Sequence, residues 1–89
     1  MLKVNVSKAS AKFLKTLPSK QGQQCALKIQ ELRKNPMSQD VKKLKGYPYY
    51  RCASGEFRIV FEIQNETLEI LLVDKRNDEQ VYKKLKRMS

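Results

Sequence analysis

Three arginines and a tyrosine in the second half of the chain have the residue types and spacing of a phosphate-binding site. They are Arg51, Arg58, Arg76 and Tyr82. An arginine side chain keeps its positive charge and can donate two parallel hydrogen bonds to one phosphate. We therefore expect these residues to form an anion site that suits a nucleic-acid backbone. In the alternative interpretation, Arg58 is a surface residue in a weak ion pair with Glu69, and Tyr82 only packs.

An antiparallel meander of three strands is predicted to carry the first two arginines. Apolar and polar residues alternate in the three expected strands, residues 49–53, 56–63 and 67–74. Three aliphatic side chains of the third strand are expected to share one face: Leu68, Ile70 and Leu72. Ser54 and Gly55 suit a two-residue hairpin loop, which would place Arg51 directly opposite Arg58. Because like charges in that position destabilise a pair of strands, this pairing suggests an anion bound between them.

The N-terminal part is predicted to be a short strand followed by two helices. Residues 2–6 alternate as a strand does, and Ser7 can cap the first helix. Ser19 can cap a second helix. The apolar stripe of that helix would consist of Cys25, Ala26, Ile29 and Leu32. The two helices would form a hairpin over one face of the sheet, and a last short helix is expected to begin at Asn77 or Asp78.

Length and charge narrow the possible functions. The 89 residues are enough for a single domain, residues 1–89, with one small core. The formal net charge is +10, from 19 Lys and Arg against 9 Asp and Glu. Twelve of the basic residues but only two of the acidic ones lie in positions 1–55. This excess favours nucleic acid as a partner over a membrane surface or an acidic protein.

Several other chemistries are disfavoured by the composition. The chain contains no histidine, so zinc sites and histidine-based acid–base catalysis are not expected. Cys25 and Cys52 lack the spacing of metal ligands and are expected to be reduced core thiols in a cytoplasmic protein. The longest purely apolar run, residues 70–73, is too short to cross a membrane. We therefore expect no metal, no cofactor and no membrane segment.

Three segments carry the most specific pattern in the chain. They are Leu44-Lys45-Gly46 with Tyr50-Arg51, the run GEFRIVF at residues 55–61, and residues 75–82, which contain Lys75-Arg76-Asn77-Asp78 and Val81-Tyr82. In this order and spacing they resemble the RelE/ParE toxin superfamily of bacterial toxin–antitoxin systems, over nearly the whole chain. The resemblance implies an α+β fold. Its sheet would be small, twisted and mainly antiparallel, with about four strands, an N-terminal helical hairpin on one face and a short C-terminal helix.

The same resemblance implies a RelE-like activity without a cofactor. Toxins of this kind enter the ribosomal decoding site and cut messenger RNA, using the ribose 2′-hydroxyl as nucleophile on the neighbouring phosphate. By position, Arg58 and Arg76 are implied to clamp the phosphate and stabilise the transition state. Tyr82 is implied to act on the base side or to stack. Further basic residues are expected to bind the RNA: Arg51, Lys75, Lys42, Lys43 and Lys45.

Two other functions stay open beside the nuclease. Ala53 stands where active RelE-type toxins often carry a second basic residue. The chain could therefore be a ParE-like inhibitor that binds DNA gyrase and cleaves nothing, or a weakened relic that only binds its antitoxin. Under all three functions the expected partner is a small acidic antitoxin encoded alongside, through which the chain would also reach operator DNA. The nuclease would also bind the ribosome and messenger RNA.

Overall fold

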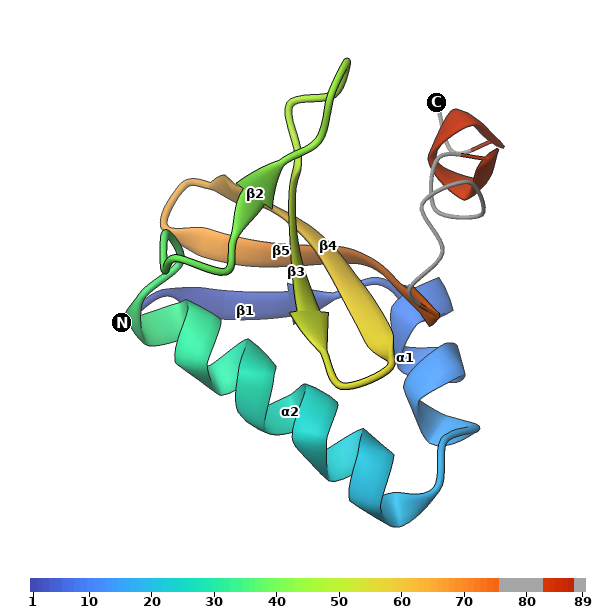
Figure 1. The fold of residues 1–89 in the computed structure, drawn as a ribbon. Coiled ribbons are helices and arrows are strands. Elements are labelled where there is room, and N and C mark those ends of the chain that lie inside the picture. Colours follow the sequence, from blue (N-terminus) through green and yellow to red (C-terminus); the bar gives the residue numbers. More distant parts are fainter. Residues whose placement is uncertain (76–82, 88–89) are drawn as a thin grey trace.

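The computed structural model describes residues 1–75 and 83–87 and contains a twisted five-stranded sheet with two long helical segments (Figure 1). The strands are β1 (Lys3–Val6), β2 (Lys42–Lys43), β3 (Tyr50–Ser54), β4 (Phe57–Gln64) and β5 (Thr67–Lys75). The helices are α1 (Lys8–Lys15) and α2 (Ser19–Lys34), and residues 83–87 are also helical. The start predicted for this last helix, at Asn77 or Asp78, lies outside the described residues. Within the described ranges, no helix is long and apolar enough to cross a membrane.

The sheet is mainly antiparallel, as predicted. Its strand order is β1-β5-β4-β3-β2, with β1 parallel to β5 and all other neighbours antiparallel. The helices α1 and α2 pack against one face, and the helical turn at residues 83–87 packs against the other. The α+β prediction is confirmed, with one strand more than expected. The additional strand is β2, which has only two residues, both of them lysines that were expected to bind RNA.

The two helices begin in different ways. Ser7 caps α1 as predicted, because its Oγ accepts a hydrogen bond from the backbone N–H of Ser10 at 3.1 Å. The prediction that Ser19 caps α2 is wrong, since the N-cap residue is Pro18 and no side chain caps that end. The Pro18 backbone is extended (φ −55°, ψ 150°), so the helix starts at Ser19 itself. The Ser19 hydroxyl therefore lies one position too late to cap it.

The main core lies between the helices and the sheet. From α2, Cys25, Ile29 and Leu32 are buried in it, whereas Ala26, predicted to join them, is exposed. One residue of α-helix turns the side chain by about 100°, which carries Ala26 away from the sheet although Cys25 faces it. The sheet contributes Cys52, Phe57, Ile59, Phe61, Leu68, Ile70 and Val73.

One extra residue in β5 changes which of its side chains face this core. Phe61 pairs with Ile70 but Val60 pairs with Leu72, so Leu71 has no direct partner on β4. This β-bulge shifts the alternation of the residues that follow it. Ile70 faces the helices, while Leu72 packs on the opposite face with Val60. The prediction that the three aliphatic residues of this strand share one face is therefore wrong.

The bulge is held in place by the residue that caps α1. The Oγ of Ser7 donates to the Leu71 carbonyl at 3.1 Å, and the Ser7 backbone N–H donates to the Ile70 carbonyl at 3.0 Å. The hydroxyl groups of Ser7 and Ser10 are 2.8 Å apart, and Ser10 is fully buried. The junction of β1 and α1 thus fixes the position of the bulge, after which the side chains of β5 exchange faces.

Candidate phosphate-binding site

The face of the sheet that turns away from α1 and α2 carries Arg51 and Arg58. Arg51 is paired with Val60, and Arg58 lies two residues before Val60 on the same strand, so all three point to one side. A small cluster covers the centre of this face: Leu44, Val60, Leu72 and Leu85. We call this side of the sheet the cationic face.

The sequence predicted that the two arginines lie directly opposite each other, and the structure shows that they do not. Arg51 pairs with Val60, and Arg58 pairs with Ala53. They are therefore diagonal neighbours on the cationic face, at a separation that long side chains can still span. The prediction was right about the face and wrong about the pairing.

The hairpin loop explains this difference. It consists of Gly55 and Glu56 rather than Ser54 and Gly55. Gly55 has φ +58°, which suits the first position of a type II′ turn, and Ser54 is left to pair with Phe57. The register moves by two residues, and a move of two keeps every side chain on its predicted face.

Arg51 does have a like-charged residue directly opposite, on its other side. The short strand β2 pairs Lys42 with Arg51 and Lys43 with Tyr50. This pairing was not predicted, because two residues are too few to show the alternation of a strand. Two cations placed side by side destabilise a strand pair, and an anion bound between them would offset that repulsion.

Arg58 lies beside an acidic residue. Within the described residues, Arg58 (8% exposed) and Asp74 (9% exposed) are the two buried charged side chains, and the register places them opposite each other. Glu69, the partner considered from the sequence, instead lies opposite Glu62 and accepts a hydrogen bond from Asn5 Nδ2 at 2.8 Å. A carboxylate beside a buried guanidinium offsets part of the free energy lost when both leave water.

Asp74 also connects the sheet to the C-terminal helical turn. Its carboxylate forms an ion pair with Lys84, and its Oδ1 accepts a hydrogen bond from the Lys75 backbone N–H at 2.8 Å. The next residue of the turn, Leu85, is buried in the cluster on the cationic face. The turn is therefore attached to the same side of the sheet as the arginines.

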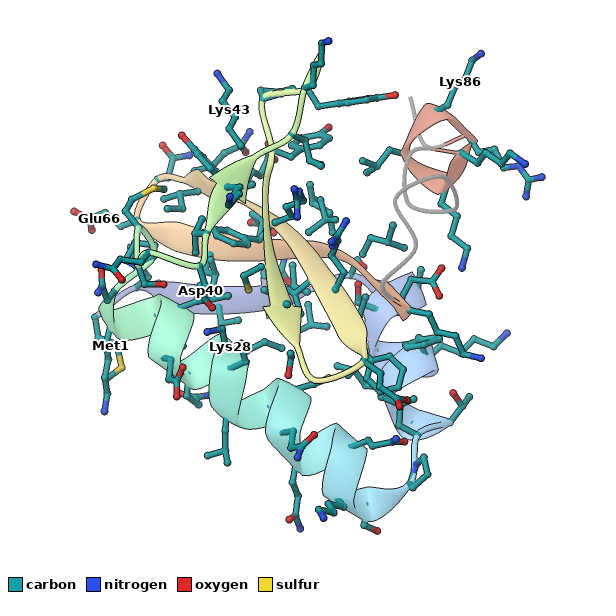
Figure 2. All side chains as sticks on the ribbon, viewed as in Figure 1. Met1, Lys28, Asp40, Lys43, Glu66 and Lys86 are labelled. Atoms are coloured by element: carbon teal, nitrogen blue, oxygen red, sulfur yellow. The ribbon has the colours of Figure 1, made fainter. Side chains whose placement is uncertain are left out.

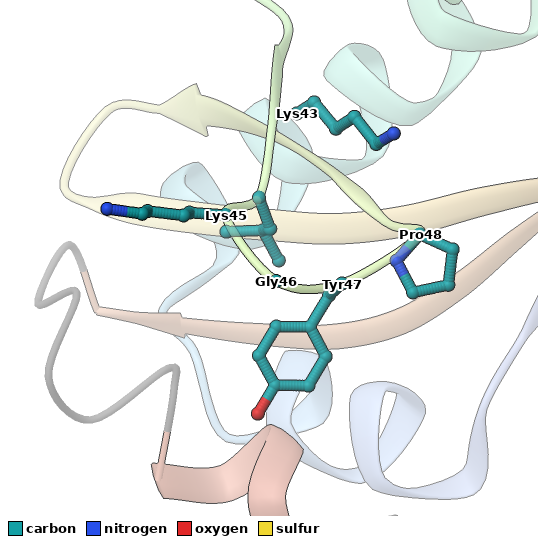
Figure 3. A pocket seen from close by; sticks show the side chains of 6 residues that line it. Lys43, Lys45, Gly46, Tyr47 and Pro48 are labelled. Atoms are coloured by element: carbon teal, nitrogen blue, oxygen red, sulfur yellow. The ribbon is translucent and has the colours of Figure 1, made fainter.

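The other predicted site residues are spread over several places. Lys75 is exposed at the end of β5. Lys43 is exposed on β2, and Lys45 is exposed in the loop that follows (Figures 2 and 3). Arg76 and Tyr82 lie outside the described residues. The structure therefore places Arg51 and Arg58 on one face of the sheet, and the roles of Arg76 and Tyr82 stay predictions.

The loop after β2 forms an open pocket of about 520 Å³ (Figure 3). Residues 43–48 line it, and the ring of Tyr47 stacks on that of Tyr49. Lys43 and Lys45 extend to opposite sides of the loop. We call residues 43–49 the tip.

The cysteines lie on the far side of the sheet from the arginines. Cys52 is 1% exposed in the main core, and burial raises the pKa of its thiol to about 12. Cys25 is also a buried free thiol. A buried thiol of this kind is not a nucleophile at neutral pH. Among the residues that the structure describes, no group of His, Cys, Asp or Glu is arranged to hold a metal ion.

The described part of the cationic face can bind phosphate and stabilise negative charge. A guanidinium group only donates hydrogen bonds and does not accept protons, and the carboxylate of Asp74 is held by Lys84. The arginines therefore act through their charge, and a proton acceptor for catalysis has to be another residue.

Comparison with known sequences finds one curated relative. A protein named Toxin RelE3, from Methanocaldococcus jannaschii, is 35% identical over 72 residues, which are 75% of this chain and 82% of that protein. No family model matches the chain. The matched share of both chains is large enough for the similarity to concern the fold as a whole.

Two solved structures of RelE–RelB complexes contain chains with a fold similar to this one. A chain of the RelE–RelB complex from Pyrococcus horikoshii has a TM-score of 0.76 at 24% identity, covering 85% of this chain and 96% of that one. A chain of the RelB–RelE antitoxin–toxin complex from Methanococcus jannaschii has a TM-score of 0.68 at 30% identity, covering 86% and 95%. The arrangement of sheet and helices described above is shared with both.

Proposed function

Because this chain belongs to the family of RelE toxins, we propose that it is the toxin of a type II toxin–antitoxin module and that it cleaves messenger RNA on the ribosome. The observation that carries this proposal is the cationic face. There, Arg58 is buried beside Asp74, and Arg51 lies directly opposite Lys42. Directly opposed cations destabilise a strand pair, so strand pairing alone does not explain why Lys42 lies opposite Arg51.

The proposed reaction makes use of such a face. The ribose 2′-hydroxyl attacks the adjacent phosphorus, and the bond from phosphorus to the 5′-oxygen of the next nucleotide breaks. Negative charge builds up on the phosphate oxygens, where fixed cations stabilise the transition state. We assign this role to Arg58 together with Arg76, and we assign the binding of flanking phosphates to Arg51 and Lys42. Lys43, Lys45 and Lys75 would bind RNA further out.

The proton transfers are assigned to residues around this face. The 2′-hydroxyl must lose a proton and the leaving 5′-oxygen must gain one. The chain has no histidine, so we assign the base side to Tyr82, to Lys75 or to a lysine of the 42–45 segment. Ala53 lies opposite Arg58, in the row where a further basic residue would otherwise stand.

We also propose that a cognate acidic antitoxin neutralises the chain. RelE chains have been solved in complexes with RelB from Pyrococcus horikoshii and Methanococcus jannaschii. The net charge of +10 favours an acidic partner. An apolar groove between α1, β5 and the C-terminal turn also supports this, because the charged side chains among the described residues that line it are all basic: Lys12, Lys84 and Arg87.

Induced expression followed by primer extension on a translated message tests the nuclease. We expect cuts at codon-defined positions that are lost in Arg76→Ala and weakened at least tenfold in Arg51→Ala. Lys20→Ala removes one charge from the far end of the molecule and should leave the cuts unchanged.

Two other outcomes would contradict the nuclease. DNA breaks that depend on gyrase, with intact messages, would indicate a ParE-like inhibitor. Intact messages and intact DNA, with tight antitoxin binding, would indicate a chain that only binds its partner.

A further inference from the structure

The tip, residues 43–49, contains features that neither the core nor the cationic face accounts for. We propose that it is a second RNA-contacting surface, on which a base of single-stranded RNA stacks against Tyr47 while Lys43 and Lys45 bind the phosphates on either side. This inference rests on the proposed function, because it presumes that RNA is the ligand. It adds a binding element outside the cationic face.

The aromatic rings at the tip are already arranged as a stack. The ring centroids of Tyr47 and Tyr49 are 6.0 Å apart and the rings are inclined by only 18°. Both side chains are only half-buried, although they pack beside Leu44. Bases of single-stranded nucleic acid stack on such rings irrespective of sequence. A bound base would lengthen a stack that exists before binding.

The backbone of the tip is held rigidly. The Tyr47 N–H donates to the Leu44 carbonyl at 3.3 Å, and the Leu44 N–H donates to the Tyr49 carbonyl at 2.9 Å. Gly46 has φ +82°, as the third residue of a type II turn requires. Pro48 restricts the backbone between the two tyrosines. A preorganised surface loses little conformational entropy on binding, so stacking there contributes more fully to affinity.

The charge around the rings matches a nucleic-acid strand. Lys43 and Lys45 are exposed and extend to opposite sides of the loop that carries Tyr47 (Figure 3). No acidic residue occurs between Asp40 and Glu56. One aromatic ring between two cations provides a base site with a phosphate site on each side.

The tip is continuous with the cationic face. Tyr47 and Tyr49 pack in the same cluster as Val60 and Leu72 on that face, whereas Lys43, opposite Tyr50, lies on the other side of β2. A strand of RNA seated on the tip would therefore continue onto the proposed phosphate site. The tip would help to set the position of the message relative to Arg51 and Arg58.

Binding of a 2′-O-methyl RNA oligonucleotide, which this chemistry cannot cleave, tests the inference by fluorescence anisotropy at several salt concentrations. We expect Tyr47→Leu to weaken binding roughly 5- to 100-fold, because stacking on the ring is lost while an apolar side chain is kept. Tyr47→Phe should bind within about twofold of the unchanged protein, because it retains the ring. Lys45→Ala should lower the slope of log affinity against log salt by about 0.7, and Lys20→Ala should not.

A matched oligonucleotide with abasic positions separates stacking from a general effect on structure. Tyr47→Leu should bind this oligonucleotide as the unchanged protein does, with the same melting temperature as Tyr47→Phe. Equal loss on both oligonucleotides, or no loss on either, would overturn the inference. Cleavage in the primer-extension assay is independent of this result. A chain that cleaves no RNA but shows the base-dependent loss would contradict the proposed function and leave the base site supported.

Discussion

Asp74 lies directly opposite Arg58 because Leu71 is an extra residue in β5. Without the bulge, the pairing of Phe61 with Ile70 would continue unchanged and would place Val73 opposite Arg58. The bulge therefore gives the buried guanidinium a carboxylate neighbour instead of an aliphatic one. Bulges commonly redirect a side chain in this way next to functional sites.

Asp74→Asn should destabilise the protein strongly, because it removes the negative charge beside buried Arg58. We expect a loss of about 2–4 kcal/mol in the free energy of unfolding, measured in urea. Lys84→Met should cost at most about 1 kcal/mol, since the Lys84 side chain is 43% exposed and its ion pair with Asp74 is screened by water. Equal losses in the two variants would show that the C-terminal turn, and not Arg58, is what Asp74 stabilises.

Ser7→Ala should cost about 1–2 kcal/mol, because Ser7 both caps α1 and donates to the bulge carbonyl of Leu71. Ser7→Asp can still cap the helix but has no hydroxyl to donate, so it should recover only part of the loss. Ser19→Ala is the matched control, since Ser19 caps nothing, and should change stability by less than about 0.5 kcal/mol. A Ser19→Ala loss as large as that of Ser7→Ala would contradict the assignment of the cap.

Glu66→Gly should stabilise the protein. Asn65 and Glu66 form the turn between β4 and β5, with φ +50° and +62°, and Asn-Gly is the preferred pair for this type I′ geometry. We expect a gain of about 0.5–1 kcal/mol, partly offset by the flexibility of glycine in the unfolded chain. Thermal unfolding measures it. Gly55→Ala provides the opposite test. Because Gly55 has φ +58°, this variant should lose a similar amount of free energy of unfolding.

The ion pair of Lys28 with Asp40 should make stability depend on pH at both ends of the range (Figure 2). The hydrogen bond from Lys28 lowers the pKa of Asp40 below its ordinary 3.8, so this stabilisation is present above about pH 4 and is lost as the pH falls through the folded pKa. The same bond raises the pKa of Lys28 above 10.5, so its contribution is lost as the pH rises beyond that value.

The effect of this pair is small, about 0.5–1 kcal/mol, because the Asp40 side chain is 45% exposed and water screens the interaction. Urea unfolding of the unchanged protein and of Asp40→Asn measures it. The difference between the two proteins should be constant from pH 5 to 9 and should vanish toward pH 2. A constant difference down to pH 2 would show that Asp40 acts through its hydrogen bond from Ser38 rather than through its charge.

Cys52 should resist alkylation in the folded protein. Its pKa is raised to about 12 by burial, so almost no thiolate exists at pH 8. Iodoacetamide should modify Cys25 and Cys52 only after unfolding, as mass spectrometry can establish.

Because the raised pKa keeps the folded thiol protonated, stability should also fall as the pH rises from about 9 toward 12. Cys52→Ser should leave messenger-RNA cleavage unchanged, whereas a loss of cleavage in a folded variant would give the thiol a catalytic role.

The fold was predictable from the sequence where patterns are long, and less so where a single residue decides. The alternation in β4, the cap at Ser7 and the apolar spacing of the helices placed the main elements. The bulge at Leu71 and the strand at Lys42 were missed, because one extra residue or a pair of residues produces no periodic signal. The loop at Gly55 was displaced by one residue, since the sequence shows that a glycine is present but not which turn position it takes.

The strand at the N-terminus has its partner near the other end of the chain. Lys3 pairs with Thr67, and Asn5 and Ser7 reach side-chain and backbone atoms 64 residues later. Synthesis runs from the N-terminus, so β1 emerges first and finds no partner until β5 has followed. The bulge, Asp74 and the contact with Lys84 are assembled at that same late moment. A ribosome making this chain is therefore exposed to a finished cationic face only after β5 and Lys84 have been synthesised.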